Sequence, residues 1–178
     1  FKPYTKSTRG TILVDRTGLW KGKPFKSLVS PKNAMKGRNN NGHITNINRS
    51  GGHKKMYRHV DFYRKKFDME ATVERIEYDP NRSCYIMLVK FEDGKHFYYL
   101  APQKIKVGDI IENGEKKEIK VGNCMPLQDI PVGIDIHNVE LQPGGGGKVA
   151  RSAGTSVSIS GLDGNYSLIK MISGEIRK

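Results

Sequence analysis

The hydrophobic pattern of this 178-residue chain changes at Met69, where short apolar or alternating runs separated by turn residues begin. The first run, residues 70–78, alternates around Val73 and Ile76 and predicts a β-strand. Its alternation slips near Arg75, and a β-bulge there would restore the facing of the side chains. We therefore expect a strand with a bulge at this position.

The pattern predicts four further strands, at residues 84–91, 96–100, 104–107 and 118–121. The first of these is almost continuously apolar, which is typical of a strand buried on both faces. Residues 92–95 form a hairpin turn that leads into the second. Five short strands around one core is the strand count of an OB-type barrel.

A second small β-unit is predicted after the prolines near residue 129. Residues 137–141, 156–160 and 167–172 have the composition of strands, and an Asp-Gly turn joins the last two. A Ser-Gly turn near the end should begin another strand, so we expect an incomplete barrel with an open edge that something else must cover. The predicted fold class is all-β, in three parts: a basic arm at 1–68, a barrel at 69–128 and an incomplete barrel at 129–178.

Electric charge divides the chain in a similar way. Residues 1–66 carry 17 Lys and Arg against two acidic residues, residues 67–142 carry 9 against 14, and residues 143–178 carry 5 against 2, for a formal net charge of +13. Basic blocks of this kind commonly bind nucleic acid. A solvated tail is the alternative, but the arm also holds large apolar residues such as Trp20 and Phe25. We expect the arm to become ordered against RNA.

Composition argues against two architectures. The chain has 20 Gly, 8 Pro and 36% hydrophobic residues, which disfavours a helical bundle. The longest apolar run, residues 84–89, is far shorter than the roughly 20 residues that a membrane-spanning helix needs. We therefore predict no membrane span.

No catalytic or metal-binding constellation can be recognised. Cys84 and Cys124 have neither the spacing nor the partners of a zinc site, and we interpret them as buried thiols of a reducing compartment. The five histidines lack a second ligand at helical or hairpin spacing, and no Ser or Cys nucleophile stands in a catalytic setting. We expect a protein that is not an enzyme and that uses no metal or cofactor.

The glycine run at residues 144–147 is similar to a phosphate-binding loop but does not fit the Walker pattern. Gln142 stands where the first glycine of that pattern belongs, and Val149 follows Lys148 where Ser or Thr should bind magnesium. The spacing of a dinucleotide fingerprint is present, but the helix it requires is not predicted. We expect a loop whose backbone approaches a polyphosphate, with Lys148 and Arg151 as counter-charges.

Two segments, residues 37–43 and 51–58, combine Gly, Asn, His and basic residues. Glycines let a backbone run close to an irregular RNA surface, Asn side chains offer donors and acceptors to base edges and 2′-hydroxyls, and Lys and Arg neutralise phosphates. A Gly/Asn-rich loop without a ligand is the alternative. The strongly basic arm favours RNA binding.

Together these segments resemble ribosomal protein two of the large subunit, a universal rRNA-binding family. The matching stretches are residues 37–45, 51–62, 73–83, 99–109, 121–133, 137–155 and 173–178. The resemblance implies a structural constituent of the ribosome that supports assembly and the peptidyl transferase region. It also implies an N-terminal extension, an OB-fold barrel and an SH3-like barrel, with rRNA contacts through the arm and through loops of both barrels.

The motifs and the resemblance together assign a set of residues to rRNA binding. They are Lys21, Lys23, Lys36, Arg38, Asn39, Asn40, Asn41, His43, Arg49, His53, Lys54, Lys55, Tyr57, Arg58, Arg64, Lys65, Lys66, Arg82, Gly145, Gly147, Lys148, Arg151 and Ser152. His43 and Gly145 stand where the family commonly has Arg and Lys. The family continues beyond Lys178 into an extension near the catalytic centre, so no residue here is assigned to that centre.

The resemblance further implies neighbouring ribosomal proteins as partners. Some organelle genomes divide the family into two chains, so we predict a separate chain that supplies the C-terminal part. An excess of 21 Lys over 10 Arg, with 16 Ile and 11 Asn, suits an AT-rich organellar genome. We predict a mitochondrial ribosome, with another organelle or the bacterial cytoplasm as alternatives.

Two other functional classes stay open from the residues alone. A soluble translation factor or single-strand binder could use the OB barrel, and it would cycle on and off ribosomes in moderate salt. An enzyme would show metal- or nucleotide-dependent activity that survives deletion of the arm.

Overall fold

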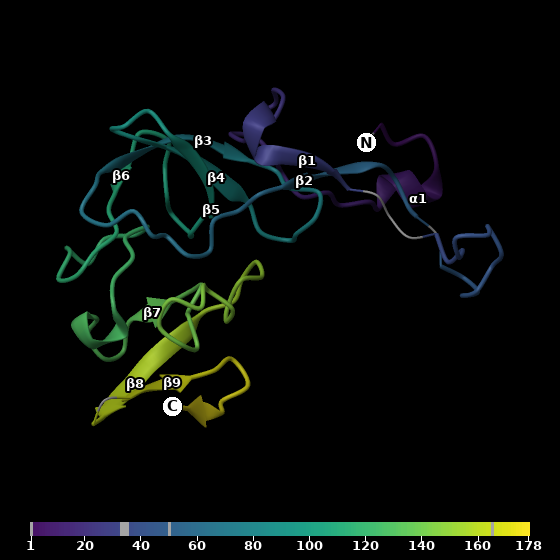
Figure 1. Ribbon diagram of the computed structural model, residues 1–178. Coiled ribbons are helices and arrows are strands. Elements are labelled where there is room, and N and C mark those ends of the chain that lie inside the picture. Colours follow the sequence, from purple (N-terminus) through teal and green to yellow (C-terminus); the bar gives the residue numbers. More distant parts are fainter. Residues whose placement is uncertain (1, 33–35, 50, 165) are drawn as a thin grey trace.

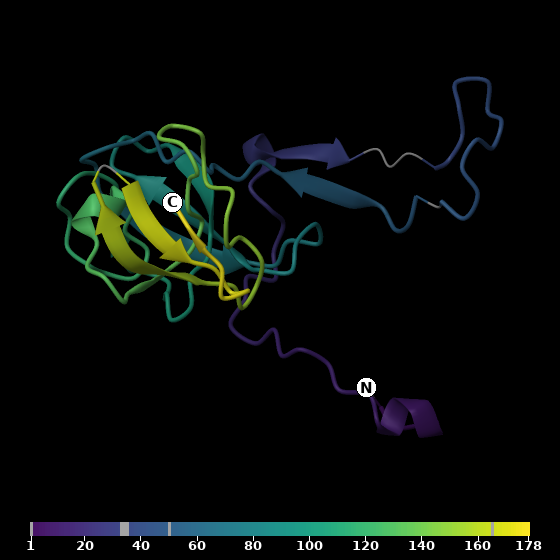
Figure 2. The same ribbon diagram turned by 90° about the horizontal axis from the view of Figure 1, so that it is seen from below.

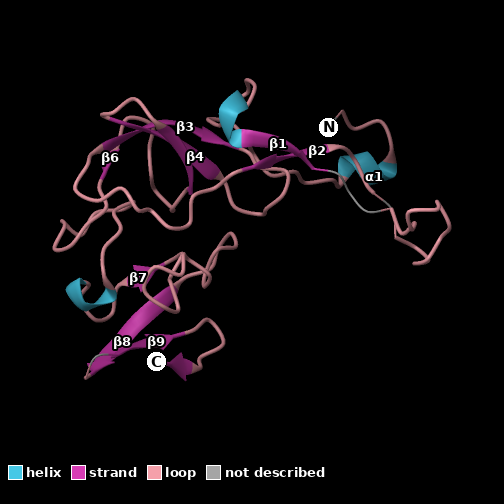
Figure 3. Cartoon of the chain, in the orientation of Figure 1, coloured by secondary structure: helices cyan, strands magenta, loops and turns pink. Residues whose placement is uncertain are grey.

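The computed structural model describes residues 2–32, 36–49, 51–164 and 166–178, and strands and loops make up most of it (Figures 1 and 3). The strands are β1 (Val29–Lys32), β2 (Lys55–Arg58), β3 (Ala71–Glu77), β4 (Ile86–Phe91), β5 (His96–Leu100), β6 (Ile110–Ile111), β7 (Asp135–Ile136), β8 (Val157–Asp163), β9 (Tyr166–Lys170) and β10 (Ile176–Arg177). The short helices are α1 (Lys6–Arg9), η1 (Lys26–Leu28) and η2 (Leu127–Asp129). The prediction of an all-β fold is confirmed.

The largest core lies around the antiparallel sheet β5-β4-β3-β6. Residues of β4 are buried on both faces, as the apolar run at residues 84–89 predicts. The register between β3 and β4 shifts between Val73 and Arg75, so the predicted bulge is confirmed. Tyr98 and Tyr99 of β5 are buried on opposite faces of the sheet and belong to two different core clusters.

The basic arm supplies the cover for one face of this sheet. Phe25, Leu28, Val60 and Phe62 pack against the core cluster that includes Tyr98. These apolar residues of the arm therefore contribute to the protein core, and the ordering of the arm against RNA stays a prediction. Burying such side chains on the sheet gains roughly 1.5–3 kcal/mol each when burial is complete.

Two of the predicted strands are wrong. Residues 104–107 and 118–121 form turns and irregular backbone, and the fourth strand of the sheet is β6. Lys104 has a φ of 73°, which turns the chain away from an extended path, and only Ile105 of that segment enters the core. In residues 118–121 both apolar side chains, Ile119 and Val121, are exposed, and a short alternating pattern does not distinguish such segments from a strand.

The second large sheet has the order β10-β9-β8-β7. The strand expected after the Ser-Gly turn is present as β10, but the strand expected at residues 137–141 is not: β7 ends before it, and Val139 makes only an isolated bridge with Val149. The core of this sheet is small, with Val139, Val157 and Ile169 at its centre.

The strands β1 and β2 pair antiparallel, from Val29 opposite Arg58 to Lys32 opposite Lys55. Figures 1 and 2 both show the segment between them, residues 36–49, projecting away from the two larger sheets. Among the helices of the described residues, none is long and apolar enough to cross a membrane.

Candidate nucleic-acid interface

The segment between β1 and β2 carries a compact loop, residues 37–45, which we call the tip. The Gly37 carbonyl accepts hydrogen bonds from the amides of Thr45 at 2.9 Å and Asn46 at 3.2 Å. Gly37 has a φ of +70°, and a Cβ atom there would lie 2.5 Å from the carbonyl oxygen of Asn46. Only glycine fits this position, and it closes the base of the tip.

Five cations surround the tip and the end of β2 that leads to it. Lys36, Arg38, Arg49, Lys54 and Lys55 are all exposed. Within the described part of the chain, no carboxylate lies within 4.0 Å of any of their charged groups. Cations without an acidic partner in the protein are free to neutralise phosphates.

The residues of the same region that are predicted to make polar contacts with RNA are also at the surface. Asn39, Asn40, Asn41, His43 and His53 are exposed. Tyr57, on β2, is half-buried and packs edge to face against His59, with ring centroids 5.4 Å apart. The arm therefore brings together amides, imidazoles and an aromatic ring beside the five cations.

A buried carboxylate fixes the base of the arm. The Asp79 side chain is fully buried, and it pairs with Arg82 Nε at 2.6 Å and with Arg58 Nη1 at 3.9 Å. Burial alone would raise the pKa of Asp79, but hydrogen bonds from Arg82 and Asn81 bring that pKa below its ordinary value. Asn81 Nδ2 also donates to the Met56 carbonyl of β2 at 2.6 Å, so this turn holds the arm and orients both arginines.

Loops of the two larger sheets come together at the ring of Phe62, which belongs to the arm. The guanidinium carbon of Arg151 lies 4.8 Å from the centre of that ring, and that of Arg82 lies 5.8 Å from it. Ser83 Oγ accepts a hydrogen bond from the Ala153 amide at 3.2 Å. This junction therefore gathers two of the predicted rRNA-binding arginines from different parts of the chain.

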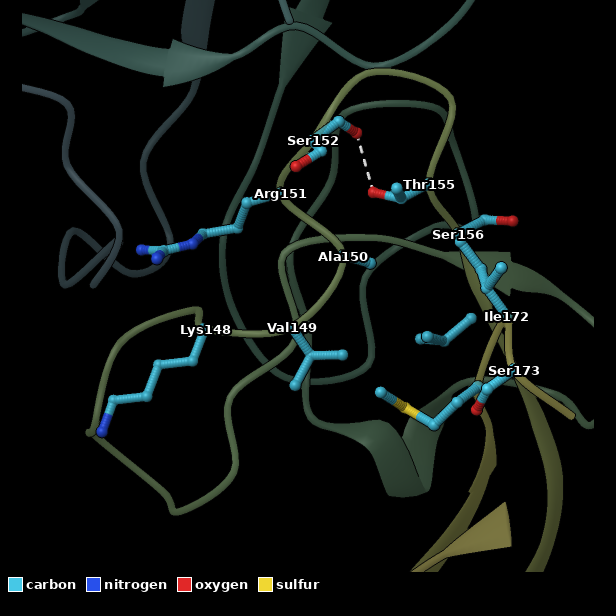
Figure 4. Close-up of a pocket in the computed structure, with 11 residues that line it drawn as sticks. Lys148, Val149, Ala150, Arg151, Ser152, Thr155, Ser156, Ile172 and Ser173 are labelled. Carbon is cyan, nitrogen blue, oxygen red and sulfur yellow. Dashed lines mark hydrogen bonds between the residues drawn. The ribbon is translucent and has the colours of Figure 1, made fainter. Parts of the chain in front are cut away.

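Figure 4 shows a shallow pocket of about 410 Å³ on the second sheet, next to this junction. The side chains of Lys148 and Arg151 extend to one side, away from the apolar Val149 and Ile172. Lys148 and Ser152 are exposed. The charged ends of these two side chains thus point away from the apolar side of the pocket.

A carboxylate of the chain itself closes the glycine loop, residues 143–148. Glu140 accepts hydrogen bonds from the Gly144 amide at 2.9 Å and from the Gly146 amide at 3.0 Å. An internal anion therefore uses the backbone donors that the expected polyphosphate contact would need. Of this loop, the exposed cation Lys148 is the group best placed to reach a phosphate.

The glycine loop is also packed into the protein. Gly147 is buried and donates to the Phe62 carbonyl at 3.0 Å. A Cβ atom on Gly147 would lie 2.2 Å from Asn138 Oδ1, and one on Gly145 would lie 3.0 Å from the Gln142 carbonyl. Gly147 therefore leaves space for Asn138, whereas the contact of Gly145 is with its own turn.

Arg64, another member of the predicted set, is bonded within the protein. It is buried, with 5% of its surface exposed, and its Nη1 donates to the Gly122 carbonyl at 2.7 Å. Its guanidinium carbon lies 4.3 Å from the centre of the Tyr99 ring, whose burial raises the pKa of that phenol to about 12. Arg64 thus anchors the arm to the first large sheet.

The other basic residues of the predicted set fall into two groups. Lys66 contacts Asp93 and lies over the rings of Phe91 and Phe97, so its charge is partly used within the protein. Lys21, Lys23 and Lys65 are exposed, and no carboxylate among the described residues lies within 4.0 Å of them. These three are available to a polyanion, although Lys21 and Lys23 lie apart from the tip in sequence.

Sequence reasoning missed the groups that position the cations. Asp79 directly follows the segment predicted as the first strand, but nothing in a single sequence shows that its carboxylate faces Arg58. Glu140 lies in a segment wrongly predicted as a strand, and its bonds to the glycine loop depend on backbone turns. Both carboxylates act on segments that only the folded chain brings together.

The assembled surface carries groups that are suited to binding. In the part of the chain that is described, no three His, Cys, Asp or Glu side chains are arranged to hold a metal ion. Both cysteines are free and half-buried, and burial raises the pKa of each thiol. Exposed cations, amides and imidazoles are the groups that contact phosphates, base edges and 2′-hydroxyls.

Two protein-family models match the chain. The first is described as "Ribosomal Proteins L2, RNA binding N-terminal domain" and matches residues 25–113. The second is described as "Ribosomal Proteins L2, C-terminal domain" and matches residues 120–178. Together they cover most of the chain, including the tip, the junction and the glycine loop.

Curated relatives carry the name large ribosomal subunit protein uL2. The protein from Pelagibacter ubique is 85% identical over 100% of this chain and 64% of its own length. Those from Granulibacter bethesdensis and Rickettsia canadensis are 56% and 54% identical over 99% of this chain, and over 64% and 65% of their own lengths. The chain thus spans slightly less than two thirds of the length of these relatives.

Proposed function

Because this chain belongs to the L2 family of ribosomal proteins, we propose that it is a structural, rRNA-binding component of the large ribosomal subunit. In this role it supports subunit assembly and the peptidyl transferase region. The observation that carries this proposal is the group of exposed cations around the tip, free of acidic partners among the described residues. This group falls within the segment that the RNA-binding family model matches. The partners are large-subunit rRNA and neighbouring ribosomal proteins.

The rRNA contacts divide into three sets. The tip and its flanks contribute Lys36, Arg38, Asn40, Asn41, His43, Arg49, His53, Lys54, Lys55 and Tyr57; the base of the arm and the adjoining junction contribute Arg58, Arg82, Lys148, Arg151 and Ser152; and Lys21, Lys23 and Lys65 lie elsewhere on the surface. Asn39 belongs to the tip, but its side-chain oxygen is already bonded within it. Arg64 and Gly147 act indirectly, because both are buried and bonded within the protein. Lys66 and Gly145 contact other protein groups, so we assign them a smaller part in rRNA binding than the exposed residues of the three sets.

The division into an arm at 1–68, an OB-fold barrel at 69–128 and an SH3-like barrel at 129–178 is part of the same proposal. It is supported by the position of the two larger sheets, which lie within the second and third parts. The arm is the part most directly concerned with rRNA, and the barrels fix its position.

The bacterial cytoplasm is the location we propose for this ribosome. The three relatives described above are bacterial proteins, which favours this alternative over the mitochondrion. The mitochondrial location and the separate chain that would supply the C-terminal part stay predictions. Mass spectrometry of the purified particle tests the latter, and a single continuous polypeptide that contains this sequence and extends beyond it would contradict a separate chain.

Co-sedimentation with large subunits tests the main proposal. We expect the chain to stay with the particle through a high-salt wash, because many contacts act at once. With protein-free large-subunit rRNA, the logarithm of the affinity should fall linearly with the logarithm of the salt concentration, since each neutralised phosphate releases counterions. Release from the particle in moderate salt, with reversible rebinding, would contradict an integral role and favour a translation factor.

A further inference from the structure

We propose that Asn39 is a positioning residue that holds the tip in a preformed shape, so that Asn40, Asn41 and His43 are presented to an unpaired stretch of rRNA. This inference rests on the proposed function and specifies the part of the rRNA that the tip binds. It assigns different roles to three consecutive asparagines that the sequence alone treats as equivalent.

Four hydrogen bonds converge on Asn39. Its side-chain Oδ1 accepts from the amide of Asn41 at 3.0 Å and from the amide of His43 at 2.9 Å. Its own amide donates to the His43 carbonyl at 3.0 Å, and its carbonyl accepts from the Gly42 amide at 3.1 Å. The side chain and the backbone of a single residue thus close the turn.

The base of the tip supports the same shape. Arg38 and Ile44 form an isolated antiparallel bridge, and Arg38 Nη1 donates to the Gly42 carbonyl at 2.7 Å. Thr45 Oγ1 and the Thr45 amide both reach the Gly37 carbonyl, at 3.4 Å and 2.9 Å. The chain therefore closes the tip with its own groups, and no RNA is needed to define the turn.

The closed turn leaves three side chains outside. Asn40, Asn41 and His43 are exposed, and their side chains make no hydrogen bond to any described residue. Amide side chains can donate to and accept from base edges and 2′-hydroxyls, and an imidazole can stack on a base. The cations Arg38 and Lys36 lie beside them to neutralise the backbone.

These groups fit unpaired nucleotides better than a regular helix. The major groove of A-form RNA is deep and narrow, so side chains on a short loop cannot reach its base edges, whereas splayed nucleotides expose base edges and faces together. A tip that is already folded loses less conformational entropy on binding than a flexible loop does. Asn39 therefore supports affinity without touching the RNA.

The variants Asn39→Ala and Asn40→Ala separate a positioning role from a contact with RNA. For each variant, the rate of hydrogen exchange at the tip amides is measured in the free protein, and the affinity for large-subunit rRNA is measured alongside it. Asn39→Ala removes both bonds to Oδ1, so hydrogen exchange at the Asn41 and His43 amides should accelerate roughly 3- to 10-fold, with a similar loss of affinity. The salt dependence of binding should stay unchanged, because no charge is lost. Asn40→Ala should weaken binding while the exchange of both amides stays as in the wild type.

Asn39→Asp is the conservative variant, since it keeps an acceptor oxygen at the same place, and it should restore the slow exchange of both amides. Wild-type affinity in Asn39→Ala, or fast exchange of the tip amides in the wild-type protein, would overturn the positioning role. Failure of the wild-type protein itself to bind large-subunit rRNA would instead overturn the proposed function. The two failures are therefore distinguishable in one set of measurements.

Discussion

The tip and the glycine loop are both rich in glycine, and the sequence assigns both to RNA, yet the folded chain treats them in opposite ways. The tip closes on the amide side chain of Asn39 and leaves its neighbours exposed. The glycine loop closes on the carboxylate of Glu140 and buries Gly147 against Asn138. One loop presents polar groups outward, and the other joins two parts of the protein.

The difference shows that glycine has two separate uses in this chain. At Gly42 of the tip, the backbone has a φ of +81° and a Cβ atom would meet nothing within 4 Å, so conformational freedom is what the turn needs. At Gly147 no positive φ is involved, and the need is for space. The first kind of glycine serves an exposed turn, whereas the second kind serves packing.

The largest effect should come from Gly147→Ala. The added Cβ atom would lie 2.2 Å from Asn138 Oδ1 and 2.6 Å from the Asn138 carbonyl oxygen, so backbone must move to admit it. Overpacking of this kind costs about 1–3 kcal/mol, and loss of the bond to the Phe62 carbonyl adds about 1 kcal/mol. Urea unfolding of the variant and the wild type measures the change in the free energy of unfolding.

Gly144→Ala is the matched control within the same loop. Gly144 has a φ of +72° and open space where a Cβ atom would stand, so only backbone strain of about 1–2 kcal/mol is expected. If Gly144→Ala proved as destabilising as Gly147→Ala, the close approach to Asn138 would cost no more than a positive φ does, and the contrast between the two kinds of glycine would fail.

The comparison also shows how far the sequence can predict this molecule. Strands with strong alternation or long apolar runs, such as β3 and β4, are predicted with their bulge because local pattern determines them. The tip is predicted as a polar, exposed element for the same reason. By contrast, the closure of the glycine loop depends on Glu140, and the burial of Arg64 depends on Gly122, which is 58 residues away. Contacts over such separations leave no local signal in a single sequence.

A smaller but specific effect is expected from removing charge near the tip. The triple variant Arg49→Ala, Lys54→Ala and Lys55→Ala removes exposed side chains that have no acidic partner among the described residues. Each lost phosphate contact should reduce the slope of log affinity against log salt by about 0.7–0.9, so the slope should fall by about 2. Filter binding to large-subunit rRNA at several salt concentrations measures it.

The control for net charge is a triple variant away from the tip, Lys90→Ala, Lys106→Ala and Lys170→Ala, with Lys90 on β4, Lys170 on β9 and Lys106 between β5 and β6. These three lysines are exposed and lie outside the proposed interface, so their removal changes the net charge equally. The salt slope should change much less than in the tip variant. Equal slopes for the two variants would mean that overall charge, and not the tip, governs binding.

The stability of the region around the glycine loop should depend on pH through His137. Burial, together with the positive charge of Arg64, lowers the pKa of His137 below its ordinary value of 6.5. The unfolded chain then binds more protons than the folded chain as the pH falls below about 6.5, so the stabilisation is complete above that pH and is lost below it. The free energy of unfolding should decrease from pH 7 to pH 5, and His137→Gln should flatten this dependence. An unchanged dependence in that variant would assign the effect to another group.

The smallest effect should come from Lys148→Ala, which tests whether the glycine loop takes any direct part in binding. The Lys148 side chain is exposed and extends away from the apolar residues of the pocket in Figure 4, while Glu140 already uses the backbone amides of Gly144 and Gly146. A single phosphate contact should therefore be lost, and the salt slope should fall by no more than about 0.9. A larger fall in the salt slope, comparable to that of the triple variant at the tip, would show that the glycine loop contacts RNA through more than this one side chain. The distinction between a tip that binds and a glycine loop that packs would then no longer hold.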